Sequence, residues 1–117
     1  MKILSWNVNG IRAVEKKGFI DYVRNSNYDI IGIQETKAQP DQLSEELLNI
    51  EGYKSYFKWA EKKGYSGVAI YSKEETIEVS DMGVLDFDNE SRVIIAKYKD
   101  FTFINAYINK FRILGDA

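Results

Sequence analysis

The sequence predicts an α+β fold in one domain, residues 1–117, with helices layered on a β-sheet. The first observation is the order of its segments, which reads strand, helix, strand, helix and then a run of strands suited to antiparallel pairing. The second is composition, because 44% hydrophobic and 14% aromatic residues are enough for a folded core. Both observations exclude a disordered or fibrous chain.

The first half of the chain alternates strands with helices. Residues 2–8 are rich in strand-forming side chains and end at Asn9-Gly10, a pair that tolerates positive φ. Apolar residues at helical spacing predict a helix over residues 15–25. The nearly unbroken apolar run of residues 28–34 is typical of a strand buried on both faces. A second helix is expected over residues 40–49, with Pro40 in its first turn.

The second half is expected to consist of strands and loops. Alternating aromatic and polar residues predict a half-exposed strand over 53–59, followed by a charged loop over 61–66. Shorter apolar runs predict strands at 67–71 and 76–79, with an irregular acidic stretch at 82–90. A two-residue turn, Lys99-Asp100, then joins strands at 92–98 and 101–108.

Charge and residue usage narrow the possible partners and compartments. The net charge is −2, so any contact with nucleic acid must rest on a local cationic patch. The sequence has no cysteine and no apolar run of 18 residues. We therefore expect no membrane partner and a cytoplasmic location.

Two polar side chains stand at the ends of successive predicted strands, Asn7 and Glu35. Parallel strands joined through a helix bring their carboxyl ends to the same edge of a sheet. An amide and a carboxylate oxygen there would suit Mg²⁺, which takes few protein ligands and keeps its waters. On the residues alone the plainer alternative is favoured, in which Asn7 caps a turn and Glu35 is a solvated strand end, since polar strand ends are common.

Five segments, in order along the chain, resemble the exonuclease III family of apurinic/apyrimidinic endonucleases, a branch of the endonuclease/exonuclease/phosphatase superfamily. They are Ser5-Trp6-Asn7-Val8-Asn9-Gly10-Ile11-Arg12-Ala13, Gln34-Glu35-Thr36-Lys37, Lys63-Gly64-Tyr65-Ser66-Gly67-Val68-Ala69-Ile70, Ser91-Arg92-Val93-Ile94 and Phe103-Ile104-Asn105-Ala106-Tyr107. The resemblance implies a four-layer α/β sandwich of two packed sheets. This chain would form its N-terminal half, one mixed sheet with helices on the outer face.

The resemblance also implies roles for matching positions. Glu35 resembles the metal-ligand glutamate, with Mg²⁺ as the cofactor and Mn²⁺ as a substitute. Asn7 resembles the asparagine beside metal and phosphate, and Tyr107 the tyrosine that orients the phosphate or the attacking water. Residues that resemble contacts to the DNA backbone are Gly10, Arg12, Ala13, Lys17, Gly64 and Tyr65. For Tyr65 the alternative of a loop aromatic packed on the sheet stays open.

The resemblance stops short of a complete site. The chain contains no histidine, and the later aspartate and Ser-Asp-His motifs of the family are absent. The implied function is a Mg²⁺-dependent AP endonuclease and 3′–5′ exodeoxyribonuclease of DNA base excision repair, acting on double-stranded DNA with abasic sites. It would be present here as an incomplete, inactive half. The alternatives are a non-catalytic half-domain for dimerisation, partner binding or weak DNA binding, or the same superfamily acting on RNA or a phosphoinositide.

The predicted strands also raise the question of a partner. Strands at 30–33, 68–71, 93–96 and 103–108 carry apolar residues on both faces, whereas two helices can cover only one face of a sheet. If all these strands lie in one sheet, its other face is an apolar patch larger than soluble monomers expose. We therefore expect a homodimer or a complementary C-terminal half.

Overall fold

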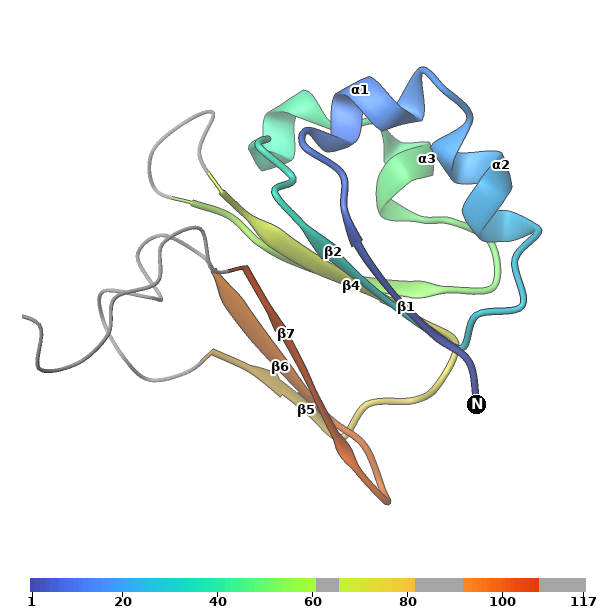
Figure 1. Ribbon diagram of the computed structural model, residues 1–117, viewed down its shortest axis with the longest axis vertical. Helices are drawn as coiled ribbons and strands as arrows, with labels where there is room; N and C mark the ends of the chain where they lie inside the picture. The colour runs from blue at the N-terminus through green and yellow to red at the C-terminus, as the bar shows by residue number, and fades with distance from the viewer. Residues whose placement is uncertain (61–65, 82–91, 108–117) are drawn as a thin grey trace, which may run out of the picture.

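The computed structural model describes residues 1–60, 66–81 and 92–107, whose helices and strands form three layers (Figure 1). Helices lie on one face of a four-stranded sheet, and a three-stranded sheet faces its other side. The elements in chain order are β1 (Ile3–Asn7), α1 (Ile11–Glu15), α2 (Phe19–Arg24), β2 (Ile30–Gln34), the 3-10 helix η1 (Pro40–Gln42), α3 (Glu45–Leu48), β3 (Lys54–Lys58), β4 (Val68–Ser72), β5 (Glu78–Ser80), β6 (Val93–Lys97) and β7 (Thr102–Ala106).

The four-stranded sheet has the strand order β1-β2-β4-β3. β1 and β2 are parallel because α1 and α2 return the chain between them, whereas β4 runs antiparallel to both β2 and β3. Every residue of β2 and β4 is buried, as expected for central strands covered on both faces. The core between this sheet and the helices is apolar and includes Phe19, Leu47 and Tyr71.

The three-stranded sheet, in the order β5-β6-β7, covers the other face of the four-stranded sheet. Ile94, Ala96 and Tyr98 meet Ile30 and other side chains of β2 and β4 in a second apolar core. The α+β class is confirmed, but the expectation that all strands share one sheet with a bare face was wrong. The chain folds its later strands back over that face instead of extending the first sheet.

Both predicted helices are interrupted. The helix expected over residues 15–25 is two helices, because α1 begins earlier, at Ile11, and Gly18 adopts φ 94° before α2. The helix expected over residues 40–49 is η1 followed by α3. Its restart is an N-cap, in which the Ser44 hydroxyl accepts a hydrogen bond from the Leu47 N–H (3.1 Å).

The predicted strands are all found, with ends that differ by at most two residues. The predicted stretch 82–90 and most of the loop 61–66, with its site candidates Gly64 and Tyr65, lie outside the described residues. Among the helices that the structure describes, none has both the length and the apolar character needed to cross a membrane.

Candidate active site at the carboxyl ends of β1 and β2

Three loops meet where β1 and β2 end, and we call this edge of the four-stranded sheet the site rim. Backbone N–H groups join the loops: Gly10 donates to the Glu35 carbonyl (2.8 Å), Ile11 to Thr36 (3.0 Å) and Lys37 to Ser66 (2.8 Å). Non-glycine residues with positive φ, a conformation that side chains disfavour, occur in the described chain only here, at Asn9, Glu35, Lys37 and Ser66. Such backbone strain persists only where surrounding hydrogen bonds maintain it, so these hydrogen bonds define the conformation of the site rim.

Gly67 is the position where the rim tolerates no side chain. A Cβ there would stand 2.1 Å from Thr36 Oγ1, and the backbone has φ 90°. Thr36 is itself buried, and its N–H donates to the Gly67 carbonyl (3.1 Å). Glycine at position 67 therefore lets β4 begin directly against the segment that carries Glu35.

The predicted residues Asn7, Glu35 and Tyr107 lie together at the site rim, although Tyr107 comes from the other sheet. Asn7 Nδ2 donates to Glu35 Oε1 (3.3 Å), and the Tyr107 hydroxyl donates to the same carboxylate. The Tyr107 hydrogen bond, followed by the Asn7 and Lys37 contacts, outweighs the effect of burial and lowers the pKa of Glu35. The same hydrogen bond raises the pKa of Tyr107, so its hydroxyl stays a donor at neutral pH.

Lys37 and Asn9 also belong to this cluster, and the sequence assigned them no role. Lys37 Nζ lies 3.3 Å from Glu35 Oε2 and donates to Asn9 Oδ1 at 2.6 Å. Arg92 adds a further positive charge that acts on Tyr107, whose N–H donates to the Arg92 carbonyl (2.7 Å). All three residues lie within the family-like motifs, so their position in those motifs was the signal that could have identified them.

The donor atoms at the rim are those a hard cation prefers. The Glu35 side chain is 15% exposed, and nearby Asn7 Oδ1 and Asn9 Oδ1 are amide oxygens that accept from the Asn9 N–H and from Lys37 Nζ. Within residues 1–60, 66–81 and 92–107, no group of three His, Cys, Asp or Glu side chains is placed to hold a metal ion together. A single carboxylate with oxygen neighbours fits one Mg²⁺ that keeps most of its water.

Asn7 is oriented by contacts on both sides of its amide. Its Oδ1 accepts from the Asn9 N–H (3.0 Å), while its Nδ2 faces the Glu35 carboxylate. Exchanging the two amide atoms would set oxygen against oxygen, so the hydrogen bonds fix this orientation. Asn7 thus presents an N–H toward the centre of the cluster, and its role as a metal ligand stays a prediction.

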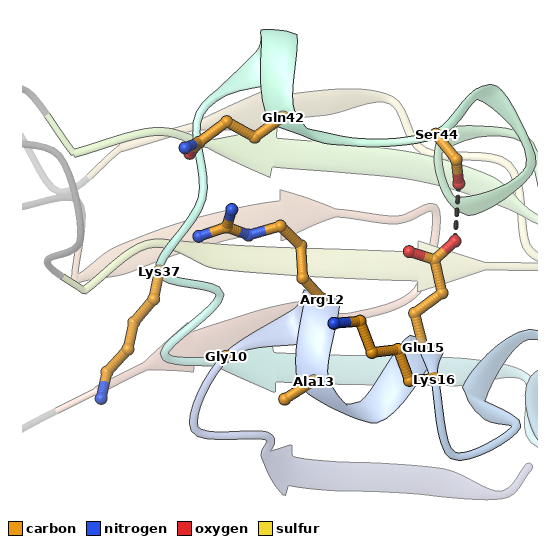
Figure 2. Close-up of a pocket in the computed structure, with 8 residues that line it drawn as sticks. All are labelled: Gly10, Arg12, Ala13, Glu15, Lys16, Lys37, Gln42 and Ser44. Carbon is orange, nitrogen blue, oxygen red and sulfur yellow. Dashed lines mark hydrogen bonds between the residues drawn. The ribbon is translucent and has the colours of Figure 1, made fainter.

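A pocket of about 540 Å³ adjoins the site rim, between α1 and the segment that holds η1 and the start of α3 (Figure 2). Three cationic side chains line it, from Arg12, Lys16 and Lys37. In Figure 2 the Arg12 guanidinium and the Gln42 amide point toward one end, and at the other Ser44 Oγ donates to Glu15 Oε2 (2.7 Å). The remaining lining residues are Gly10 and Ala13.

The predicted DNA contacts are thus divided by the structure. Gly10, Arg12 and Ala13 line this pocket, whereas Lys17 does not and is exposed in the turn after α1. Gly64 and Tyr65 lie outside the described residues, and the chain re-enters the described part at Ser66, whose carbonyl accepts from the Lys37 N–H. The pocket is lined by three cationic side chains and one carboxylate, and the Lys37 ammonium among them is already paired with Glu35.

Comparison with known proteins finds one family and several relatives. The model of the endonuclease/exonuclease/phosphatase family matches residues 4–110. An exodeoxyribonuclease of Bacillus subtilis is 43% identical over 109 residues, which cover 92% of this chain and 42% of that protein. A DNA-(apurinic or apyrimidinic site) endonuclease of Dictyostelium discoideum is 38% identical over 109 residues, covering 92% of this chain and 30% of that protein.

Solved structures show the same fold. An AP endonuclease from Archaeoglobus fulgidus superposes with a TM-score of 0.74 at 34% identity, over 92% of this chain and 41% of that one. The 3′ phosphatase NExo from Neisseria, bound to a product DNA hairpin, gives a TM-score of 0.75 at 30% identity with the same coverage. The chain therefore spans less than half the length of these relatives.

Proposed function

This chain belongs to the endonuclease/exonuclease/phosphatase family, and we propose that it is part of a DNA-repair phosphodiesterase of the exonuclease III type. The proposed reaction is hydrolysis of a DNA phosphodiester on the 5′ side of an abasic site, with 3′–5′ exodeoxyribonuclease activity as a second reaction. One observation carries the proposal: Asn7, Glu35 and Tyr107 come from strand ends in two sheets and meet around one carboxylate. The names of the relatives from Bacillus and Dictyostelium support it.

Each of these residues has a proposed task. Glu35 would hold Mg²⁺, or Mn²⁺ in its place, and the bound ion would supply polarisation of a phosphoryl oxygen and stabilisation of the leaving oxyanion. The Asn7 N–H and the Tyr107 hydroxyl are both donors aimed at the same point, so they can orient phosphate oxygens there. With one carboxylate we expect a millimolar dissociation constant for Mg²⁺, as an order of magnitude.

Double-stranded DNA is the proposed substrate, held mainly through its backbone. Arg12, Lys16 and Lys37 can neutralise phosphates in the pocket beside the site rim, and Gly10 and Ala13 allow close approach. Lys17 and the Gly64-Tyr65 segment are proposed as further backbone contacts. Contacts of this kind carry no base sequence information, so binding should be insensitive to sequence and sensitive to salt.

We propose that further polypeptide completes the active site. The chain has no histidine to assist the attacking water, and it spans only 30–42% of the first relatives. β7 is an edge strand of the three-stranded sheet, and its residue Ile104 is 60% exposed. Strands of a complementary C-terminal half, or of a second copy of this chain, could pair at that edge. The expected cytoplasmic location stays a prediction.

The second candidate function is a non-catalytic module. It is favoured by the absence of histidine and by the single carboxylate at the centre of the cluster, since a general base typically contributes about 10²- to 10⁴-fold in rate. In that case the chain would bind DNA weakly or pair with another chain. The two candidates differ in one measurable property, hydrolysis by a completed fold.

A chimera tests the proposal. We would replace the matched 109 residues of the Bacillus exodeoxyribonuclease with this chain and incubate the product with an abasic-site duplex and Mg²⁺. We expect hydrolysis that Glu35→Ala abolishes and that Glu51→Ala, at an exposed turn, leaves unchanged. The chain alone should be silent. A folded chimera without hydrolysis would refute the catalytic proposal, and rapid Glu35-dependent hydrolysis by the chain alone would refute the need for a second part.

A further inference from the structure

A buried polar bridge joins the two sheets directly behind the site rim. It consists of the side-chain amides of Gln34, the last residue of β2, and Asn105, on β7, and only 7% of Gln34 and 3% of Asn105 are exposed. Gln34 Nε2 donates to Asn105 Oδ1 at 2.6 Å. Each residue precedes a member of the candidate site, since Glu35 follows Gln34 directly and Tyr107 lies two residues after Asn105.

Asn105 uses both of its N–H bonds to span β2 and β4. Its Nδ2 donates to the Ile33 carbonyl (2.9 Å) and to the Ala69 carbonyl (2.8 Å), and these residues are direct partners across the two strands. Gln34 Nε2 also donates to Ser5 Oγ on β1 (3.0 Å). The bridge therefore connects four strands, β1, β2, β4 and β7. Its hydrogen bonds also fix which atom of each amide donates and which accepts.

The backbone leaves room for the bridge at one residue. A Cβ on Gly32 would stand 3.0 Å from Asn105 Oδ1 and 3.1 Å from Phe103 Cζ. Both contacts are tighter than real Cβ atoms usually make, so a side chain at position 32 would require the Asn105 amide and the Phe103 ring to shift by a few tenths of an ångström. Glycine in the middle of a buried strand weakens it, and here it permits the close approach of a second backbone.

The bridge is surrounded by apolar side chains, which sets its energetic character. The layer between the sheets is otherwise built from residues such as Ile30, Val68 and Ile94. Buried amides in such a layer contribute little net stability when satisfied, and they are costly when one partner is lost. Their particular contribution is to define one alignment of the sheets, which apolar contacts alone specify weakly.

We propose that Gln34 and Asn105 are positioning residues that set the separation between Glu35 and Tyr107. Glu35 is carried by one sheet and Tyr107 by the other, and the bridge is the direct side-chain hydrogen bond between the strands that carry them. If the sheets slid or separated, the Tyr107 hydroxyl would leave the Glu35 carboxylate without any change in either residue. The inference rests on the proposed function for its catalytic meaning, but its structural content can be tested without hydrolysis.

The decisive variant is the double substitution Gln34→Met with Asn105→Leu. Replacing both amides by apolar groups of similar shape leaves neither amide buried without the other, and the remaining cost is that the Ile33 and Ala69 carbonyls and Ser5 Oγ lose a side-chain donor. We would record nuclear Overhauser effects between the Tyr107 ring and the Glu35 side chain in the wild type, the double variant and the control Ile30→Val. Ile30 lies in the same layer, at the far end of β2.

We expect the wild type and the control to show the Tyr107–Glu35 contact and the folded double variant to lose it. A folded double variant that keeps the contact would overturn the proposal and leave the bridge a purely structural feature. If the double variant does not fold, Gly32→Ala provides the second test, because its methyl group crowds the Asn105 amide, which should disturb the bridge and weaken the same contact. An unchanged contact in Gly32→Ala would equally overturn it.

The chimera adds a kinetic measurement. There the double variant should lower kcat by about 10²-fold, the effect of a displacement near 1 Å, with a much smaller change in KM. Equal changes in the double variant and in Ile30→Val would contradict a positioning role. If the wild-type chimera does not hydrolyse DNA, the proposed function fails, while the spectroscopic result still decides whether the bridge positions Glu35 and Tyr107.

Discussion

At one end of the four-stranded sheet the strands run into loops with positive φ that surround a carboxylate, whereas at the opposite end the connections are closed by tyrosine and lysine contacts. Tyr53 illustrates the second end. Its hydroxyl donates to the Tyr28 carbonyl (2.6 Å) and lies 2.9 Å from Ser26 Oγ, while Lys73 Nζ sits 5.4 Å from its ring. Nearby, the Lys2 N–H donates to Asp29 Oδ2 (2.8 Å).

The two ends therefore use polar groups differently. At the site rim, Lys37, Asn7 and Tyr107 all converge on Glu35, so several groups depend on one charge that a ligand could also use. At the opposite end the contacts of Tyr28, Ser26 and Lys73 gather on Tyr53, a neutral side chain, and not on a carboxylate. We infer that the opposite end contributes mainly to stability and the site rim mainly to function. Gly67, at the site rim, is the exception.

The largest expected effect is at Gly67, where the site rim itself is essential to folding. Gly67→Ala would place a methyl group on Thr36 Oγ1 and force a side chain into φ 90°. Overpacking and the left-handed backbone together should lower the free energy of unfolding by about 3 kcal/mol. Denaturant unfolding measures this change.

A matched double variant separates the two causes. Adding Thr36→Ala removes the clashing hydroxyl but not the backbone penalty, so Gly67→Ala should become less harmful in that background. If the cost of Gly67→Ala is the same with and without Thr36, the clash is not its cause, and the close approach of β4 to the Glu35 segment is not essential.

Tyr53 tests the opposite end. Tyr53→Phe leaves the Tyr28 carbonyl without its side-chain donor and removes the contact to Ser26 Oγ, which keeps its hydrogen bond to the Val23 carbonyl, so it should destabilise the fold by about 1–2 kcal/mol. Mg²⁺ and DNA binding should be unchanged. Tyr107→Phe is the matched removal of a hydroxyl at the site rim. An equal loss of stability from both variants would show that the two ends do not differ as described.

The fold class followed from the sequence, and so did the meeting of Asn7 and Glu35, because each stands at the end of a clear strand and parallel strands bring their ends together. Tyr107 was identified only through the family resemblance, since it follows a strand of the other sheet. The interruptions of the helices at Gly18 and Ser44 were harder to predict. The helical spacing of apolar residues continues across both positions, whereas the helical backbone stops and restarts there. Local periodicity records which face is buried, and it does not record where a short helix stops.

The assignment of strands to sheets could not be read from periodicity at all. Residues of β4 and β6 look alike in sequence, since both strands are short and apolar. What separates them is the packing of Ile94 and Ala96 against Ile30 and Val68, a contact between distant parts of the chain. Gln34 and Asn105 were missed for the same reason, because their meaning depends on a 2.6 Å contact across 71 positions.

Arg12 tests the cationic side of the site rim. Arg12→Ala removes one charge from the pocket, so the slope of log K against log salt for a DNA duplex should become shallower by about one unit. Arg24→Ala is the control, since Arg24 is paired with Asp21 on α2 and does not line the pocket. Equal changes in slope would place DNA binding on the general surface instead of the pocket.

The smallest expected effect is the pH dependence that Glu35 gives to stability. Its pKa is lowered in the folded chain, chiefly by the Tyr107 hydrogen bond, so folding favours the ionised carboxylate. This contribution is fully present above the pKa that the carboxyl has in the unfolded chain. It is lost as the pH falls through the lower pKa of the folded state.

Glu35→Gln should therefore flatten the fall in the free energy of unfolding on the acid side, and Tyr107→Phe should flatten part of it by removing the main hydrogen bond. Glu51→Gln is the control, because Glu51 is exposed in a turn. Unfolding by denaturant at a series of pH values between about 3 and 7, which bracket the usual carboxyl pKa, gives the slopes. If Glu35→Gln and Glu51→Gln have the same slope, the Glu35 carboxylate is not held as the hydrogen bonds indicate, and the site rim loses the single charge that distinguishes it from the opposite end.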